Sequence, residues 1–277
     1  MNAEKTIRSQ ARTLLSKGNW SQSLGVFFIL FAGIMLVLFV QSILVLGAEL
    51  AVTPLFDNLA EHMEVFDLSD ADSIGFGLLT IVQSFFGYLA YALGFLFLFP
   101  LYCGVKRYFY LMSKDESNGI SDVFYYLTKK FKKTTGFGLR FGLLSLLKML
   151  PCFAPVVILM GVMTTNEFST LANSILTISA IIVGIAGFLL WMLWTSRQFL
   201  SIYLFIEDDS LPSGTYARES AKIINNMLNS SVRKLNFSFI GWLLLALTGV
   251  GMLYFVPYYE TSLAISAKWM IKLQKEV

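Results

Sequence analysis

The sequence predicts an all-α fold, a polytopic helical membrane bundle of six transmembrane helices that forms a single integral membrane domain over residues 1–277. Three observations predict it. The chain is 56% hydrophobic and only 14% charged, far more apolar than a soluble domain of this length needs to be. It contains four apolar runs long enough to cross a bilayer as helices. Most of its lysines and arginines lie in alternate connecting segments, as in multi-pass membrane proteins.

The four apolar runs each exceed the roughly 20 residues that an α-helix needs to cross about 30 Å of hydrocarbon. They cover residues 24–47, 74–104, 136–163 and 171–194. The basic amino-terminal segment leads into a first run that is too long for a signal core and lacks a small-x-small cleavage site. We therefore expect the first span to remain in the protein as an anchor.

The basic residues set the predicted orientation. They precede the first span, lie between the second and third, and follow the fourth, whereas the loops over residues 48–73 and 164–170 contain no lysine or arginine. Positively charged loops stay in the cytoplasm, so the amino terminus is predicted to be cytoplasmic.

The last apolar stretch, residues 235–260, crosses the membrane either once or twice. A single crossing would place Lys268, Lys272 and Lys275 outside, against the pattern in the rest of the chain. Two crossings with a turn at Gly249 and Gly251 would return them to the cytoplasm, although residues 235–248 form only about 21 Å of helix. Six spans with a cytoplasmic carboxy terminus are therefore preferred, and five spans are the alternative.

In the six-span topology, a basic, partly amphipathic cytoplasmic segment precedes each of three hairpins. The order is a cytoplasmic amino-terminal segment 1–23, hairpin one 24–104, a cytoplasmic basic segment 105–135, hairpin two 136–206, a cytoplasmic amphipathic segment 207–234, and hairpin three with the tail 235–277.

The outer loop of the first hairpin is predicted to hold an interfacial helix over residues 53–66. Its apolar side chains share one helical face, and Pro54 suits a first-turn position. The acidic residues Asp67, Asp70 and Asp72 follow. They lack the glycine and the distant glutamate of a calcium loop, so a solvated acidic turn is the preferred interpretation.

Lys148 is the sharpest polar feature, because it lies near the middle of the third span beside Pro151 and Pro155. A central lysine costs about 2.5 to 3.5 kcal/mol in a membrane helix, so it either marks a functional or paired site or snorkels toward the interface. Counted from the helix ends, Glu260 lies at a similar depth. The two are hypothesised to pair or to line a polar cavity, and Arg197 completes this candidate intramembrane site.

The sequence predicts no catalytic, cofactor-binding or metal-binding residues. His62 is the only histidine, Cys103 and Cys152 fall in or beside apolar runs where a disulfide is not expected, and nucleotide-loop and hydrolase motifs are lacking. The protein is therefore not expected to be an enzyme.

Membrane lipids are the expected partners. The basic run at residues 129–133 lies next to a span, so it is predicted to contact anionic headgroups and not nucleic acid. Small residues four apart allow close helix approach, within the bundle or in a homodimer: Ala90 and Gly94, Gly138 and Gly142, Ala180 and Gly184.

The carboxy-terminal third resembles a bacterial membrane-protein family, domain-of-unknown-function family 975. The resemblance covers "SRQFLSIYLFIEDD" at residues 196–209 and the stretch 235–264, with "ARTLLSKGNW" near the amino terminus less diagnostic. Its most specific residues are Ser238, Phe239, Ile240, Gly241, Trp242, Gly249, Gly251, Pro257 and Tyr258. Ser230 and Ser231 stand where the family usually has a Lys-Gly pair, and "PCFAP" replaces its usual Pro-Gly turn.

This family is distantly similar to the membrane domain of some bacterial glycerophosphodiester phosphodiesterases. The resemblance implies a bundle fold in the bacterial cell membrane and brings no activity with it. The expected function is a non-enzymatic membrane module that binds lipid or another amphiphile, or assists a transport or envelope-stress system. The alternatives are a small-solute or lipid transporter with a polar path at Lys148 and Glu260, and an intramembrane lipid enzyme.

Overall fold

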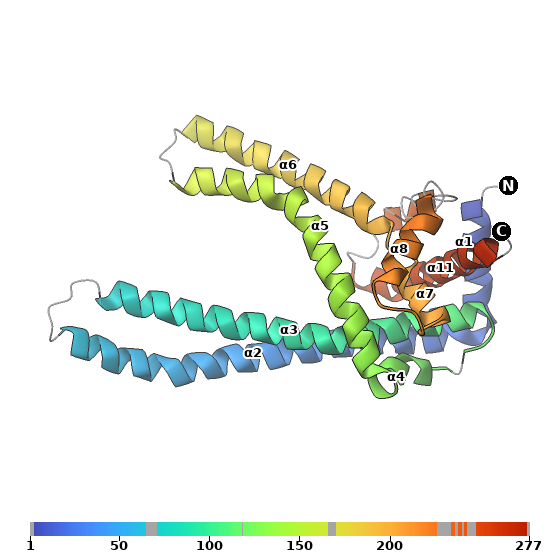
Figure 1. Cartoon of the computed structure of the whole chain (residues 1–277), viewed down its shortest axis with the longest axis horizontal. Helices are drawn as coiled ribbons and strands as arrows, with labels where there is room; N and C mark the ends of the chain where they lie inside the picture. Colours follow the sequence, from blue (N-terminus) through green and yellow to red (C-terminus); the bar gives the residue numbers. More distant parts are fainter. Residues whose placement is uncertain are drawn as a thin grey trace.

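The computed structural model describes residues 3–64, 71–117, 119–165, 170–225, 234–235, 238–239, 241–242 and 248–275, and every long regular element in these ranges is helical. The molecule is elongated (Figure 1). Two helix pairs, α2/α3 and α5/α6, project from one end. That end, here called the head, consists of α1, η1, α4, α7, α8, α11 and the carboxy-terminal end of α3. Both chain termini lie in the head.

The first helix pair follows a sharp change of direction near the amino terminus. Helix α1 (Ala3–Leu14) is joined by a kink, the segment η1 (Leu15–Asn19), to α2 (Trp20–Glu64). Gly18 has a φ of 91°, a conformation that glycine adopts readily. Helix α3 (Ala71–Ser113) packs along α2, and a side chain at Gly94 would collide with Val37. Small residues thus bring these two helices into close contact.

The predicted interfacial helix over residues 53–66 is wrong as a separate element. Helix α2 continues without a break through Pro54 to Glu64, so the proline lies inside a helix and not in a first turn. The adjacent Thr53 donates a hydrogen bond from its hydroxyl to the Glu49 carbonyl oxygen at 2.8 Å, which reinforces this turn. Asp67 and Asp70 lie outside the described residues, and Asp72 lies in the first turn of α3.

Helix α3 continues past the predicted end of the second span at Gly104 and ends at Ser113. The reason is tertiary: Lys106 finds a carboxylate partner inside the head, so the first charge does not end the helix. Gly104 also lets the backbone of α4 (Ser121–Thr128) approach α3 closely at Val123.

The second helix pair is formed by α5 (Phe131–Thr165) and α6 (Thr170–Ser196). Helix α5 holds Pro151 and Pro155 and changes direction along its length (Figure 1). Internal prolines bend helices in this way. Near its start α5 packs against α3, where Phe99 occupies the space that a side chain at Gly138 would need.

The head is completed by α7 (Ser201–Glu207), α8 (Thr215–Ile223) and α11 (Val250–Lys275). Gly249, at the position of the predicted glycine turn, has a φ of 69°. Gly251 is already helical, and its N–H donates to the Thr248 hydroxyl at 3.1 Å, an N-terminal cap. Residues 243–247 lie outside the described residues.

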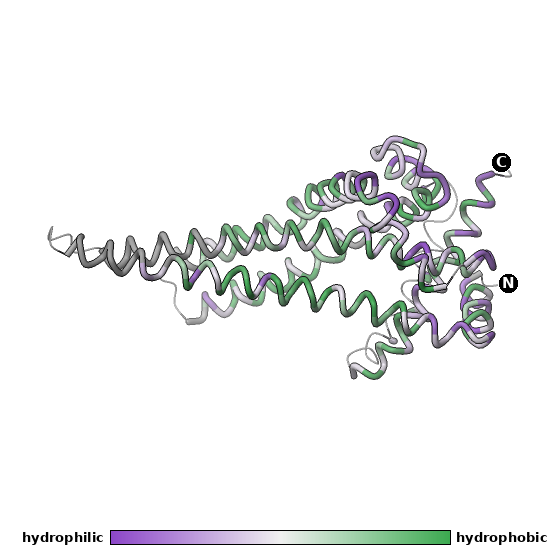
Figure 2. Tube along the Cα trace, turned by 90° about the horizontal axis from the view of Figure 1, so that it is seen from below, coloured by the Kyte–Doolittle hydropathy of each residue, from purple (hydrophilic) through white to green (hydrophobic). Residues whose placement is uncertain are grey.

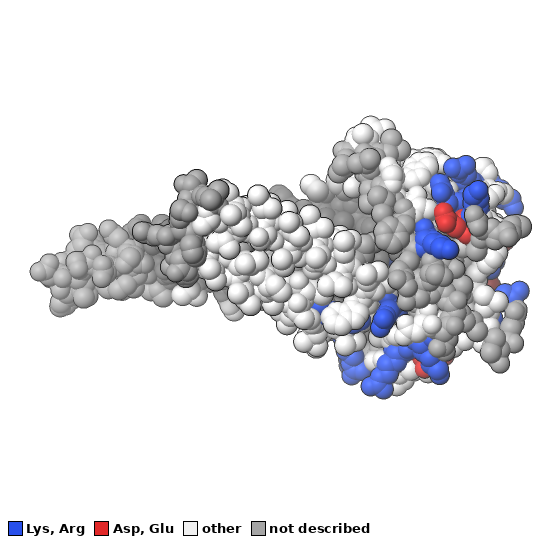
Figure 3. Space-filling view, turned by 90° about the horizontal axis from the view of Figure 1, so that it is seen from above, with Lys and Arg blue, Asp and Glu red and all other residues white. Residues whose placement is uncertain are grey.

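Apolar and charged residues separate along the molecule. Figure 2 shows hydrophobic residues along the long helices and hydrophilic ones toward the two termini, and Figure 3 shows charged side chains gathered at the head on the face in view. Four helical stretches in the described residues are long and apolar enough to cross a membrane: Glu4–Ala51, Ser84–Ser113, Phe131–Met163 and Ala172–Glu207.

The surface of these stretches agrees with a membrane environment. Leu50 of α2 and Val157 of α5 are 68% and 67% exposed, and many large apolar side chains beside them are also uncovered. Soluble monomers rarely leave so continuous an apolar surface open. The four long apolar helices are therefore compatible with a membrane-embedded protein.

Candidate functional site

Glu260 does not pair with Lys148, so the predicted pairing is wrong. The Glu260 carboxylate lies 2.6 Å from the ammonium of Lys106, and the two side chains are only 12% and 5% exposed. The reason is the packing of α11, which lies against α1, α2, α3 and α7, so that Glu260 faces α3. Lys148 belongs to α5.

The Lys106–Glu260 pair is enclosed by aromatic rings. The Lys106 ammonium lies 5.2 Å from the ring centre of Tyr102 and 5.7 Å from that of Tyr203. The pair therefore joins α3, α7 and α11, with each charge compensated inside the head. Removing one partner of such a pair would leave the other charge buried and uncompensated. The Lys106–Glu260 pair is therefore a structural element of the head and not an open binding site.

Lys148 reaches the end of α6, near Arg197. The Lys148 ammonium lies 3.5 Å from the Trp194 carbonyl oxygen, and Arg197 follows three residues later. The backbone at Arg197 is fixed by Ser220, whose hydroxyl donates to the Arg197 carbonyl at 2.8 Å and accepts the Leu200 N–H at 3.1 Å. Within the described part of the chain, neither cation forms an ion pair.

An apolar groove lies between the two helices of this pair and ends at Arg197. It encloses about 480 Å³. Helix α5 contributes Pro151, Cys152 and Pro155 to its lining, and α6 contributes the apolar residues Val183, Ala186, Gly187, Leu190, Leu193 and Trp194. We call it the α5/α6 groove. Its walls suit a hydrocarbon chain, and the two cations near its end suit an anionic head.

The residues that carry the family resemblance form an aromatic cluster in the head. Tyr258 is completely buried, and its ring centre lies 5.4 Å from Phe239 and 5.7 Å from Trp242. Tyr254 contacts Trp242 at 5.8 Å and also Trp20 at 5.0 Å between ring centres. Ile240 lies outside the described residues. Segments that are distant in sequence therefore meet here.

The arginines of α1 cover this cluster. The Arg8 guanidinium donates from Nε to the Tyr258 hydroxyl at 3.2 Å and lies 5.6 Å from the ring centre of Phe239. Arg12 lies 5.7 Å from the ring centre of Tyr258. Cation–π contacts of this kind hold the amino-terminal helix on α11. The sequence motif is thus accounted for by packing and not by a ligand.

Sequence reasoning missed the role of the acidic residues that end "SRQFLSIYLFIEDD". Glu207 accepts hydrogen bonds from Lys114 at 2.5 Å, Lys275 at 2.9 Å and Tyr110 at 3.0 Å, joining the ends of α3, α7 and α11. Asp209 binds Lys130 at 3.0 Å and Lys133 at 3.6 Å, at the start of α5. A run of acids between segments rich in lysine was the available signal.

The turn after Glu207 is held by further hydrogen bonds. The Tyr216 hydroxyl interacts with the carbonyl oxygens of Asp208 and Leu211 at 2.9 Å and 3.1 Å. Burial, with the nearby charges of Asp208 and Asp209, raises the pKa of Tyr216 to about 12. Hydrogen bonds from Ser210 lower the pKa of Asp208. The protonated tyrosine and the ionised aspartate are therefore the stable forms at neutral pH.

The described residues contain no group of three His, Cys, Asp or Glu side chains that could hold a metal ion. Cys103 and Cys152 are free and buried, as expected. Comparison with the models of known protein families, with curated proteins and with solved structures gives no match. The resemblance to family 975 therefore stays a prediction.

Proposed function

We propose that this protein is a non-enzymatic module of the bacterial cell membrane that binds an amphiphile with an anionic head in the α5/α6 groove. One observation carries the proposal: an apolar groove of about 480 Å³ ends at Arg197, with Lys148 close by, and neither cation has an ion-pair partner among the described residues. Unpaired cations beside lipid are costly, and an anionic head would compensate them.

The groove and the cations would have different tasks. Lipid tails are as apolar as leucine, so transfer of a hydrocarbon chain from the bilayer into the groove contributes little by itself. Selectivity would come from the head, through charge-assisted hydrogen bonds to Arg197 and Lys148 that are worth about 1.5 to 3 kcal/mol each. A carboxylate or a phosphate would bind, and a neutral alcohol would not.

The proposal includes both termini in the cytoplasm and, of the six spans expected from the sequence, the four that the described residues contain, because α11 packs within the head. It is supported by the common location of the basic residues: Lys268 donates to the Ser113 carbonyl and Lys275 to Glu207, in the same head that holds Lys130. An even number of spans brings the carboxy terminus back to the side of the amino terminus. The geometry gives no support to a transport path through Lys148 and Glu260, because Glu260 binds Lys106.

Photolabelling tests the proposed function. The purified protein in maltoside micelles is irradiated with a diazirine fatty acid or with the matching diazirine fatty alcohol, and labelled peptides are mapped by mass spectrometry. We expect the acid to label α5 and α6 around Cys152 and Leu190. The double variant Lys148→Gln/Arg197→Gln should reduce this labelling about tenfold, which corresponds to about 1.4 kcal/mol.

Arg140→Gln provides the matched control, because Arg140 is an exposed cation of α5 that does not line the groove. This variant should label like the wild type. Equal labelling by acid and alcohol, or unchanged labelling of the double variant, would refute an anion-selective groove.

A further inference from the structure

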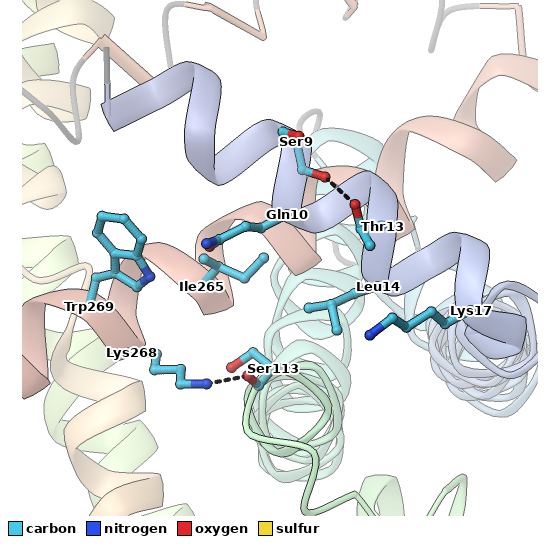
Figure 4. A pocket seen from close by; sticks show the side chains of 9 residues that line it. All are labelled: Ser9, Gln10, Thr13, Leu14, Lys17, Ser113, Ile265, Lys268 and Trp269. Atoms are coloured by element: carbon cyan, nitrogen blue, oxygen red, sulfur yellow. Dashed lines mark hydrogen bonds between the residues drawn. The ribbon is translucent and has the colours of Figure 1, made fainter. Parts of the chain in front are cut away.

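A second, polar pocket lies in the head, far in sequence from the α5/α6 groove. It encloses about 320 Å³ between α1 with η1, the end of α3, and α11. Figure 4 shows the side chains that line it. Lys17 and Lys268 extend into it from opposite walls, with Gln10, Thr13 and Trp269 around them.

The pocket carries positive charge without compensation from its own walls. None of the described residues that line it is acidic. Lys268 donates one hydrogen bond to the Ser113 carbonyl at 2.5 Å, which leaves two of its three ammonium protons for another acceptor. Lys17 is exposed and has no ion pair among the described residues. A concave site with one sign of charge concentrates ions of the opposite sign.

The backbone holds both lysines in place. Lys17 lies in η1, where the positive φ of Gly18 turns the chain and the Asn19 amide donates to the Leu14 carbonyl at 3.0 Å. Lys268 follows Ala267, which is completely buried and fixes this turn of α11 in the head. Lys268 is therefore presented by a helix, and Lys17 by the kink between α1 and α2, whose backbone these contacts fix.

We propose that this pocket binds a phosphate group. A phosphate carries up to two negative charges and several acceptor oxygens, which match two ammonium groups, the Gln10 amide and the hydroxyl of Ser9. The volume also leaves room for an organic substituent beside the Trp269 ring. The phosphate belongs either to a lipid headgroup or to a soluble phosphate ester. This site is separate from the proposed amphiphile groove and does not depend on it.

Fluorescence titration tests the site. The full-length protein in maltoside micelles, which contain no phosphate, is titrated with inorganic phosphate in one arm and with dispersed phosphatidic acid in the other. We expect saturable quenching in at least one arm, and loss of that signal in Trp269→Phe identifies the reporting tryptophan. Lys17→Gln should weaken binding about tenfold, and Lys17→Gln/Lys268→Gln should abolish it.

Lys5→Gln is the matched control, because Lys5 is an exposed lysine of α1 that does not line the pocket. Saturation by inorganic phosphate would identify a soluble ester as the source, and saturation by phosphatidic acid alone would identify a lipid headgroup. Failure of both arms would overturn the proposal, as would an equal loss of binding in Lys5→Gln. Lys17→Gln removes no described contact, so its result does not depend on altered folding.

Discussion

The core of the head and the α5/α6 pair treat their charged side chains in opposite ways. In the head, Lys106 binds Glu260, and Glu207 binds both Lys114 and Lys275. In the α5/α6 pair, Lys148 reaches only a backbone carbonyl. The head is therefore held together by compensated charges and stacked aromatic rings. The helix pair is held by close packing of small residues, and its cations remain available to a ligand.

The largest effect on stability is expected from a variant that breaks the charge compensation of the head. Glu260→Gln leaves the Lys106 ammonium buried without its partner, which should lower the free energy of unfolding by about 3 to 5 kcal/mol. The double variant Lys106→Met/Glu260→Met removes both charges and should recover most of that loss. Unfolding in mixed micelles, followed by circular dichroism, measures both. If Glu260→Gln is as stable as Lys106→Met/Glu260→Met, the loss of the partner charge does not destabilise the head.

A smaller effect on the free energy of unfolding is expected from a variant that tests the packing of the α5/α6 pair. A Cβ atom at Gly187 would collide with the Cys152 carbonyl oxygen, so Gly187→Ala should push α5 and α6 apart and cost about 1 to 3 kcal/mol. Gly161→Ala is the control. No atom lies within 4 Å of the added methyl group there, so it should be neutral or slightly stabilising.

The same unfolding assay compares these two variants. If both alanines change the free energy of unfolding equally, close helix contact does not hold the α5/α6 pair. Labelling of the groove by the photoreactive fatty acid should also fall in Gly187→Ala alone.

The smallest effect on the fold is expected from a substitution that serves as a topology probe. It reports on which side of the membrane the head lies. Lys275→Cys, in a Cys103→Ala/Cys152→Ala background, places one thiol near the carboxy terminus. An impermeant maleimide should label it only after the cells are opened, because the proposed topology puts the head in the cytoplasm. Labelling of intact cells would reverse that assignment, and a cysteine at residue 49 is the control for the opposite face.

Local features of the sequence predicted local features of the fold. The apolar runs correspond to long helices, and Gly249 turns the chain with a φ of 69°. The extent of α3 could not be predicted, because hydropathy falls at Lys106 while its partner Glu260 lies 154 positions further along the chain. The continuation of α2 through Pro54 could not be predicted for a related reason, because a proline favours the first turn of a helix unless the surrounding structure holds the helix together.

The candidate site shows the same limit more clearly. Counting residues from helix ends gave Lys148 and Glu260 a similar depth, but depth does not determine which helices face each other. The packing of α11 against α3 assigned Glu260 to Lys106. The lysines of the head pocket had no sequence signal, because Lys17 and Lys268 come from opposite ends of the chain.

The contact between α1 and α11 has a consequence for how the protein is made. Arg8 and Tyr258 are 250 positions apart, yet they hydrogen bond in the finished molecule. During synthesis α1 leaves the ribosome before the aromatic residues that cover it. The head can close only after α11 has been made. A chain truncated before α11 would keep its long apolar helices but leave α1 uncovered, a state that a quality-control protease could distinguish from the closed head.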